Sequence, residues 1–186
     1  MNQEKMKRKT DAGKIWQEYQ KGVAYNHSIN LYDTVKKNEN FYIGNQWVGI
    51  NAPDIDKPTF NFLKRVVTYF ISQLVSDDIA VQFRAKQDTA EARVCCDVFK
   101  NEIDRVIEKT KAKTKARKML RNAAVDGDGC MHFYFDPTIE NGQMVKGEIV
   151  AEVLDNLRVM FGNPNCRDVQ RQPFIIISRR EMVDEV

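Results

Sequence analysis

The sequence predicts an α+β chain in which the helices come first, one of them long and charged, and a mostly antiparallel sheet follows. Up to residue 125 the apolar residues recur at helical spacing. From Cys130 onward they fall in short runs separated by turn sequences such as GNPN, as strands do. Helices followed by strands are typical of α+β architectures and not of alternating βαβ units.

Length and composition indicate a folded chain. Its 186 residues are 42% hydrophobic and 30% charged, which is the balance of a globular protein. A chain of this length normally forms one domain, with or without an arm. We therefore expect a flexible basic arm over residues 1–14 and a single α+β region over residues 15–186, helical to 125, strand-rich over 126–178, with a truncated helix over 179–186.

Several classes of protein are excluded early. No apolar stretch approaches the roughly 20 residues of a membrane span, and no apolar core follows the basic N-terminus as it would in a secretory signal. The four cysteines include the adjacent pair Cys95 and Cys96 but no CxxC motif, so we expect reduced and mostly buried thiols. We predict a cytosolic product without membrane partner, metal or cofactor.

The helical region contains three predicted segments. A helix or helix pair is expected over residues 15–40, followed over 41–58 by an ordered loop anchored by aromatic side chains. Asn61 can cap the next helix, whose wide apolar face places it at the centre of the expected core. Alternating residues over 79–85 then predict a half-buried strand.

The long helix has an anomaly in its apolar pattern. Asp88 and Glu91 form an Asp variant of the capping box, and the helix is expected to continue to about Val125. At 100° per residue, its first apolar stripe lies roughly 200° from a second stripe of Ala112, Ala116, Met119 and Ala123. Either the helix breaks near Thr110, or its two halves bury opposite faces.

The C-terminal end carries another helix signal. Ser178 and Glu181 form a capping box, yet few residues follow it, and so short a helix is marginal without packing. We expect this chain to be the front part of a longer protein, the alternative being a natural end with a short docked helix.

Catalytic signatures are sparse. His27 and His132 are the only histidines, and no GxSxG, HExxH, GxxxxGK[ST] or GxGxxG motif occurs. Asp126, Asp128 and Asp136 could supply oxygen ligands to calcium or to a nuclease metal, but the spacing does not fit an EF-hand. A helix that ends at a glycine before a strand explains this segment better. We predict that the chain is not an enzyme.

The positive charge is concentrated in one helical segment without acids. Its seven bases are Lys109, Lys111, Lys113, Lys115, Arg117, Lys118 and Arg121. Such a cluster is the footprint of nonspecific nucleic-acid binding, but it is also compatible with a solvated helix or with one that faces an acidic subunit. Phe41, Tyr42 and Trp47 could stack bases, although loop anchoring is the simpler role.

The order of several short motifs resembles one known family. FYIGNQW, the Asn61-capped helix, the charged helix ending in DGDG, HFYFD, GEIVAEVLDNLRVMFGNPN and DVQRQPFIII together resemble the N-terminal part of tailed-bacteriophage (or prophage) portal proteins. The likeness extends from about Tyr32 to Val186 and covers the arm and much of the wing, but not the stem or clip.

The resemblance implies a structural role in the virion. Portal subunits form a homo-oligomeric ring, usually a dodecamer, at one capsid vertex after assembly in the host bacterial cytoplasm. Double-stranded DNA passes through the ring, and terminase, capsid or scaffold and head-completion proteins dock on it. Because ring contacts are heterologous, the helix from Val94 to Ile107 is expected to pack within the subunit. The stripe of Ala112, Ala116, Met119 and Ala123 is expected at or near a subunit boundary. The alternative is a small basic nucleic-acid-binding protein that uses residues 109–121.

Overall fold

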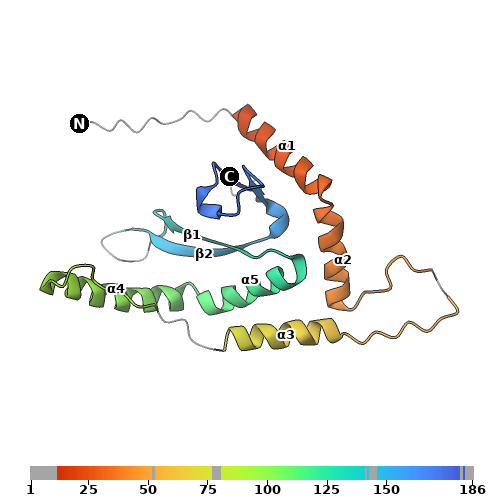
Figure 1. The fold of residues 1–186 in the computed structure, drawn as a ribbon, viewed down its shortest axis with the longest axis horizontal. Helices are drawn as coiled ribbons and strands as arrows, with labels where there is room; N and C mark the ends of the chain where they lie inside the picture. The colour runs from red at the N-terminus through yellow and green to blue at the C-terminus, as the bar shows by residue number, and fades with distance from the viewer. Residues whose placement is uncertain are drawn as a thin grey trace. The chain divides into compact units, whose positions relative to one another are not determined.

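The computed structural model describes residues 12–51, 53–76, 81–140, 142, 146–180 and 182. Helices precede strands, which confirms the α+β class (Figure 1). The elements are α1 (Ala12–Ser28), α2 (Leu31–Ile43), α3 (Phe62–Leu74), α4 (Ala90–Lys109), α5 (Ala112–Asp126), β1 (Cys130–Asp136), β2 (Glu148–Leu154), the 3-10 turn η1 (Asn156–Arg158), β3 (Val159–Phe161), the 3-10 turn η2 (Val169–Arg171) and β4 (Ile175–Ile177).

The strands form two separate antiparallel pairs. β1 pairs with β2 from Cys130↔Leu154 to Asp136↔Glu148, and β3 pairs with β4 from Val159↔Ile177 to Phe161↔Ile175. The strands expected in the C-terminal region are therefore confirmed, but they make two small sheets among the described residues and not one. The turn η1 lies between β2 and β3 in the chain.

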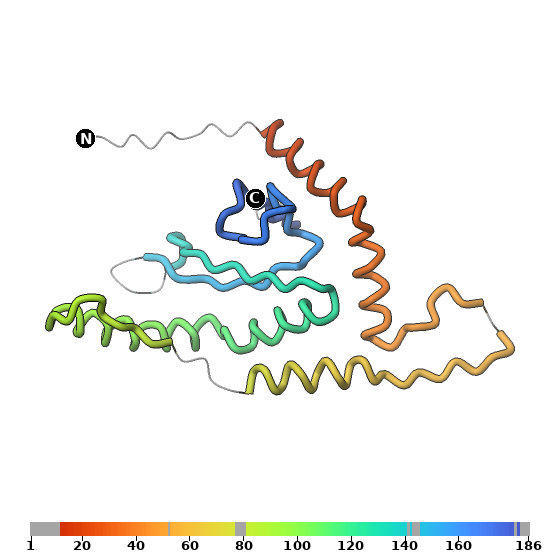
Figure 2. Tube along the Cα trace, in the orientation of Figure 1, coloured from red at the N-terminus to blue at the C-terminus, as the bar shows by residue number. Residues whose placement is uncertain are grey.

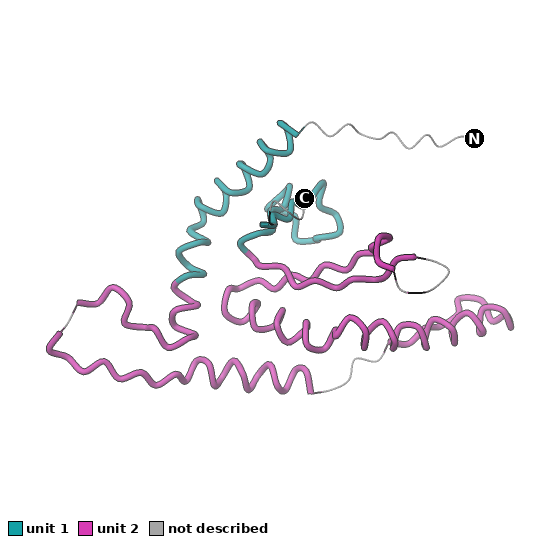
Figure 3. The backbone as a smooth tube through the Cα atoms, turned by 180° about the vertical axis from the view of Figure 1, so that it is seen from behind, with its two compact units in different colours: residues 1–36, 157–186 teal, residues 37–156 magenta. Residues whose placement is uncertain are grey.

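The chain clusters into two compact units, which Figure 3 distinguishes by colour. The first consists of Met1–Lys36 and Leu157–Val186, and the second of Lys37–Asn156. In the first unit α1 packs on β3; in the second, α5 packs on β2, β1, α3 and α4. The two segments of the first unit come from opposite ends of the colour range in Figure 2.

A glycine sets the packing within the first unit. Gly22 of α1 lies so close to β3 that a Cβ there would stand 2.6 Å from Cγ and 2.7 Å from Cβ of Met160. Met160 and its neighbour Val159 are both buried. Gly22 therefore allows α1 to approach the strand more closely than any other residue could.

In the second unit one asparagine closes two helix ends. Asn61 accepts a hydrogen bond from the backbone N–H of Lys64 and so caps α3, as expected. Its Nδ2 donates to the carbonyl of Tyr42 in the last turn of α2 at 2.7 Å. Gly44, with φ +90°, ends α2 through paired backbone bonds to the carbonyls of Phe41 and, from Asn45, of Asn40, which is a Schellman motif.

The expected loop over residues 41–58 was therefore placed too early. Helix α2 continues to Ile43, so Phe41 and Tyr42 are helical. The turn formers begin only at Gly44, where the positive φ that glycine tolerates ends the helix. Within the remaining loop, the Trp47 Nε1 donates to the carbonyl of Pro58 at 3.3 Å.

The expectation that α3 lies at the centre of the core was wrong. None of its described side chains is buried, and Phe62, Tyr69 and Leu74 are each more than 60% exposed. Helix α3 packs on α5, while the wider part of its apolar face is open to solvent. Amphipathic spacing indicates that a face must be covered, but it does not say that the same chain covers it.

The segment between α3 and α4 also differs from expectation. No strand forms over residues 81–85; residues 79 and 80 lie outside the described residues. The side chain of Phe83 instead lies 5.8 Å from the ring of Phe99 in α4. The N-cap of α4 is Thr89 and not Asp88, whose carboxylate pairs with Arg93.

The long charged helix breaks at Thr110 and Lys111, which confirms one of the two alternatives. The Thr110 hydroxyl donates back to the carbonyl of Val106 at 2.6 Å, and Lys111 takes a positive φ of 51°. Back-bonding of this kind competes with the helical ladder, and the left-handed residue then restarts the chain as α5. The helix ends at Asp126, one residue beyond the expected position.

The remaining differences concern the ends and the thiols. Residues 12–14 of the expected arm are already helical, and residues 1–11 lie outside the described chain. Residues 179, 180 and 182 are not helical, so the expected C-terminal helix is absent there; its other positions, including Glu181 of the capping box, lie outside the described residues. The cysteines are free as expected but none is fully buried, and Cys95 is exposed.

Replacing Gly22 with Ala tests the close packing of α1 on β3. Overpacking costs about 1–3 kcal/mol and the gain in helix propensity offsets about 1 kcal/mol, so we expect a net loss of stability. Urea denaturation followed by Trp16 fluorescence would measure it. The double variant Gly22→Ala with Met160→Ala should lose less than the sum of the two single losses. Additive losses would contradict the contact, and Ala24→Ser on exposed α1 surface is the control.

Candidate interaction site around helix α5

The seven bases predicted as a contact surface divide into two groups in the structure. Lys109 pairs with Glu148 of β2, Lys115 donates to the carbonyl of Ala151 at 2.6 Å, and Arg121 pairs with Glu39 of α2. Lys113 also has an interaction. The side chains of Lys111, Arg117 and Lys118 are exposed and have no polar partner among the described residues. Lys109 stays about half exposed (51%) despite its partner, so four of the seven bases are exposed and three of these have no polar partner among the described residues.

The local sequence explains why α5 needs these acceptors. Its N-cap Lys111 makes no side-chain cap, and its first turn contains no acid but carries lysines. Positive charge near a helix N-terminus opposes the helix dipole, so the charges in the first turn of α5 do not stabilise its N-terminal end. Strand β2 compensates for part of this positive charge, since the carboxylate of Glu148 pairs with Lys109 at the end of α4 and the carbonyl of Ala151 accepts from Lys115.

Arg121 combines an ion pair with a contact to an aromatic ring. Both terminal nitrogens donate to the carboxylate of Glu39, and the guanidinium carbon lies 4.8 Å from the centre of the Tyr42 ring. Nη1 also reaches Oδ1 of Asn122 at 3.4 Å. Hydrogen bonding to Glu39 raises the pKa of Arg121 above its ordinary value. Only arginine can combine the two-pronged contact with stacking.

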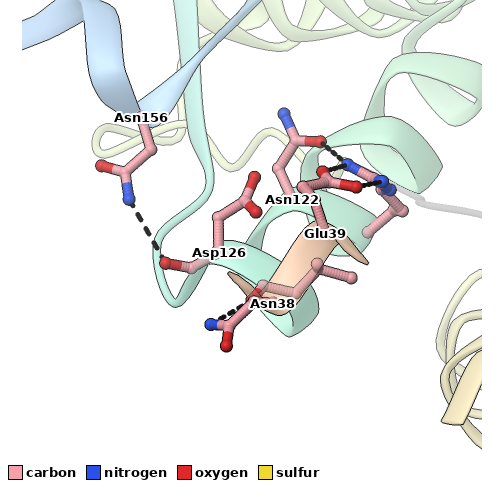
Figure 4. Close-up of polar contacts among 7 residues, drawn as sticks. Asn38, Glu39, Asn122, Asp126 and Asn156 are labelled. Atoms are coloured by element: carbon pink, nitrogen blue, oxygen red, sulfur yellow. Dashed lines mark hydrogen bonds and ion pairs between the residues drawn. The ribbon is translucent and has the colours of Figure 1, made fainter. Parts of the chain in front are cut away.

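Three hydrogen-bond donors cap the C-terminal end of α5, and Figure 4 shows two of them, Asn38 and Asn156. The N–H of Gly127, at φ +97°, donates to the carbonyl of Ala123, which is the expected glycine-terminated helix. Asn38 of α2 donates to the carbonyl of Val125 at 3.0 Å, and Asn156 of η1 donates to the carbonyl of Asp126 at 3.4 Å. We call Asn38, Glu39, Arg121, Asp126 and Asn156 the α5 end cluster.

Within the α5 end cluster, Asp126 lies in an unfavourable environment for a carboxylate. Its Oδ1 atom is buried without a hydrogen-bond partner in the described structure. Burial raises the pKa of the Asp126 carboxyl above its ordinary value, and the nearby charge of Glu39 raises it further, partly opposed by Arg121. A carboxylate at a helix C-terminus also opposes the helix dipole. The cluster therefore holds this carboxyl group at an energetic cost.

The predicted stripe of small residues faces the chain itself along part of its length. A Cβ built on Gly129 would lie 2.6 Å from the carbonyl of Met119 and 3.0 Å from Cβ of Ala123. Ala112 and Ala116 are half-buried. The stripe thus lets the chain turn closely past α5 before β1 begins, and its placement at a subunit boundary stays a prediction. Conversely, Val94 of α4, which we expected to find inside, is 62% exposed.

The acids and histidines considered for chemistry are spread apart. Asp126 precedes β1, and Asp136 is the last residue of this strand, whose seven residues span about 20 Å. Asp136 accepts hydrogen bonds from Thr138, which lower the pKa of its carboxyl group. His27 lies against the ring of Tyr32, and His132 stacks on Tyr134. The described residues contain no group of three side chains that could hold a metal ion.

Sequence reasoning found the α5 bases but missed Glu39, Asn38 and Asn156, which bind the C-terminal half of the helix. Each is one polar residue among many, 82 positions from its partner in the case of Glu39. The alanine stripe and Gly129 were the only local signals of close packing on α5.

No protein-family model, no curated protein and no solved structure matches the chain. Among the described residues, no helix is both long and apolar enough to span a bilayer.

The Arg121–Glu39 pair should contribute measurably to stability. Both side chains are only about a third exposed (30% and 31%), so we expect a coupling of about 1 kcal/mol in a double-mutant cycle of Glu39→Gln and Arg121→Gln. Urea denaturation would measure it. The similar pair Arg93–Asp88 is 67% and 76% exposed and is the control, with coupling near zero. Equal coupling in the two cycles would contradict the role of burial.

Replacing Asp126 with Asn should stabilise the chain near neutral pH. The raised pKa means that the folded state holds the proton more tightly than the unfolded state, so wild-type stability falls as pH rises through the folded pKa. The amide resembles the protonated carboxyl, and the advantage of the variant should vanish below the ordinary aspartate range. Denaturation midpoints at acidic and neutral pH would test this, with Asp128→Asn on exposed backbone as the control. A pH-independent difference would refute it.

Proposed function

We propose that this chain is the N-terminal, wing-forming part of a tailed-phage or prophage portal subunit. In this role it is a structural component of a ring at the capsid vertex, where DNA passes during packaging and ejection. Terminase, capsid and head-completion proteins dock on the assembled ring. The chain performs no catalysis, and the energy for packaging comes from a partner ATPase.

The exposed apolar face of α3 is the observation that carries the structural role. Six large side chains of one helix, Phe62, Leu63, Val66, Tyr69, Phe70 and Leu74, are each more than half exposed. At the area of such side chains they present on the order of 600 Å², the upper end of the largest patch on a typical monomer. A surface of this kind is expected on a subunit that assembles with other chains.

The order of the motifs along the chain is what suggests a portal subunit in particular. Its motifs correspond to successive elements here: FYIGNQW spans the end of α2, the DGDG segment ends α5, and HFYFD lies on β1. The α+β order of elements is compatible with a portal wing. These observations support the proposal through the arrangement of motifs, since each motif alone is short.

A nucleic-acid-binding protein is the second candidate. Because several of the seven bases are bound by acceptors within the chain, they argue against a DNA-binding surface that uses all seven. Of the seven bases, only Lys111, Arg117 and Lys118 have exposed side chains without a described polar partner. If three phosphate contacts form, the logarithm of the affinity for DNA should fall against the logarithm of salt with a slope of about −2.7, much shallower than seven contacts would give.

Electron microscopy of the product of the uninterrupted reading frame would test the portal proposal. Negative-stain images should contain rings with a central hole about as wide as a DNA duplex. Small particles from a reading frame that ends at Val186 would overturn the proposal.

The triple variant Lys111→Gln, Arg117→Gln and Lys118→Gln separates the two candidates. For a portal, ring formation should largely survive, because these side chains bind nothing within the described chain. For a nucleic-acid-binding protein, DNA binding and its salt dependence should be lost in a filter-binding or anisotropy titration. Incubation with DNA and magnesium should give no cleavage, and cleavage would favour a nuclease that uses Asp126, Asp128 and Asp136.

A further inference from the structure

The hairpin of β3 and β4 leaves one edge of β4 without a neighbouring strand. Just beyond β4, the N–H of Ser178 donates to the carbonyl of Arg158 at 2.9 Å, so Ser178 points its backbone groups toward β3. In an antiparallel pair, residues that exchange such bonds alternate with residues that do not. The N–H and C=O groups of Ile175 and Ile177 therefore point away from β3, and they have no hydrogen-bond partner among the described residues.

This open edge of β4 borders an apolar face. The pairs Phe161↔Ile175 and Val159↔Ile177 place four apolar side chains on one face of the hairpin, and Ile175 is 40% exposed. Met160 lies on the opposite face, toward α1. An unpaired edge beside an apolar face is a template for one more extended strand, and its backbone groups supply the binding energy.

The chain also contains an extended segment that belongs to no sheet. Residues 81–85 (VQFRA) alternate between apolar and polar side chains as a strand does, yet they form no strand. Their backbone N–H and C=O groups make no hydrogen bond within the described chain. The ring of Phe83 lies 5.8 Å from that of Phe99 and is still 39% exposed. The segment thus has the pattern and the free backbone groups of a strand that lacks a partner.

The edge and the segment match each other in register and in charge. Placed antiparallel, Phe83 lies opposite Ile175 and Val81 lies opposite Ile177, so both side chains extend the apolar face of the hairpin. Antiparallel order also places Arg84 near the start of β4. Parallel order would instead bring Arg84 toward the two arginines that closely follow β4, and like charges on neighbouring strands are destabilising.

We infer that residues 81–85 of one copy add as a third strand to the β4 edge of a second copy. The two surfaces differ, since β4 lies in the first compact unit and residues 81–85 lie in the second, and such a heterologous contact can continue around a ring. The contact rests on the proposed function for its ring and adds to it the surfaces through which neighbouring subunits meet. It is small, so it is weak between two chains and is reinforced when a closed ring repeats it.

Amide hydrogen exchange of the 186-residue chain, measured by NMR, tests the contact. Raising the chain concentration should slow exchange at Ile175 and Ile177 about tenfold, whereas Ile176, which is bonded within the hairpin, should exchange slowly at every concentration. Val81→Pro removes an N–H that faces the edge and should largely abolish the slowing. Gln82→Pro is the matched control, because the N–H of the alternate residue points away from the edge, and it should have no effect.

Mixing two variants shows whether the added strand comes from another copy. Isotope-labelled Val81→Pro chain keeps its β4 edge, and unlabelled Ile175→Pro chain keeps residues 81–85. Neither proline removes a backbone hydrogen bond of the described chain, so both variants should fold like wild type by circular dichroism. Slow exchange at Ile177 of the labelled chain should return when the unlabelled chain is added.

Four results would overturn the contact. Exchange that stays fast in wild type at the highest soluble concentration would exclude any added strand. Slow exchange that does not depend on concentration would place the strand within one chain. Slow exchange that persists in Val81→Pro would indicate that β4 pairs with β4 of a second copy. Failure of the mixture to restore slow exchange would show that residues 81–85 are not the strand that adds.

Electron microscopy of the same variants separates this contact from the portal proposal. Rings from the full reading frame that form equally well with Val81→Pro and with Gln82→Pro would contradict the contact and leave the portal proposal standing. Slow exchange that the mixture restores, without any ring from the full reading frame, would support the contact and contradict the portal proposal.

Discussion

The second compact unit depends on how the C-terminal end of α5 is held. A helix leaves its last carbonyls without partners, and here Gly127, Asn38 and Asn156 donate to three of them. One donor comes from the helix itself, one from α2 and one from η1, so the same few bonds fix three elements. The Arg121–Glu39 pair adds charge to this junction. Strands β1 and β2 pack on the same helix.

The contacts made by the lysine-rich segment suggest a different role from the one that its charge alone suggests. A run of bases without acids is the expected footprint of a phosphate-binding surface. At the start of α5, however, Lys113 and Lys115 lie at the end of the helix where the dipole disfavours positive charge. Lys109, Lys115 and Arg121 are bound by acceptors on β2 and α2. Charge that is neutralised within the fold is no longer available to a nucleic acid. Exposed apolar surface, and not charge, is therefore the more informative feature of this chain.

Local signals predicted the elements better than their packing. The strands of the C-terminal region, the glycine end of α5 and the Asn61 cap depend on residues close together in sequence, and all three were predicted. The strand over residues 81–85 was not, because alternation says nothing about whether another strand is available to pair. Phe83 contacts Phe99 of a helix instead. The N-cap moved by one residue because the carboxylate of Asp88 was taken by Arg93.

The sequence by itself determined the order of helices and strands, the ends of several helices and the concentration of bases, because periodicity, caps and composition are local properties. Only the tertiary structure decided that Glu39 binds Arg121, that asparagines from two elements cap α5, and that the most amphipathic helix faces solvent. These are contacts between residues far apart in the chain, and apolar spacing is the same whether the face is covered by the chain or by a partner. For this reason the sequence predicted α3 to lie in the core, whereas in the structure its apolar face is exposed.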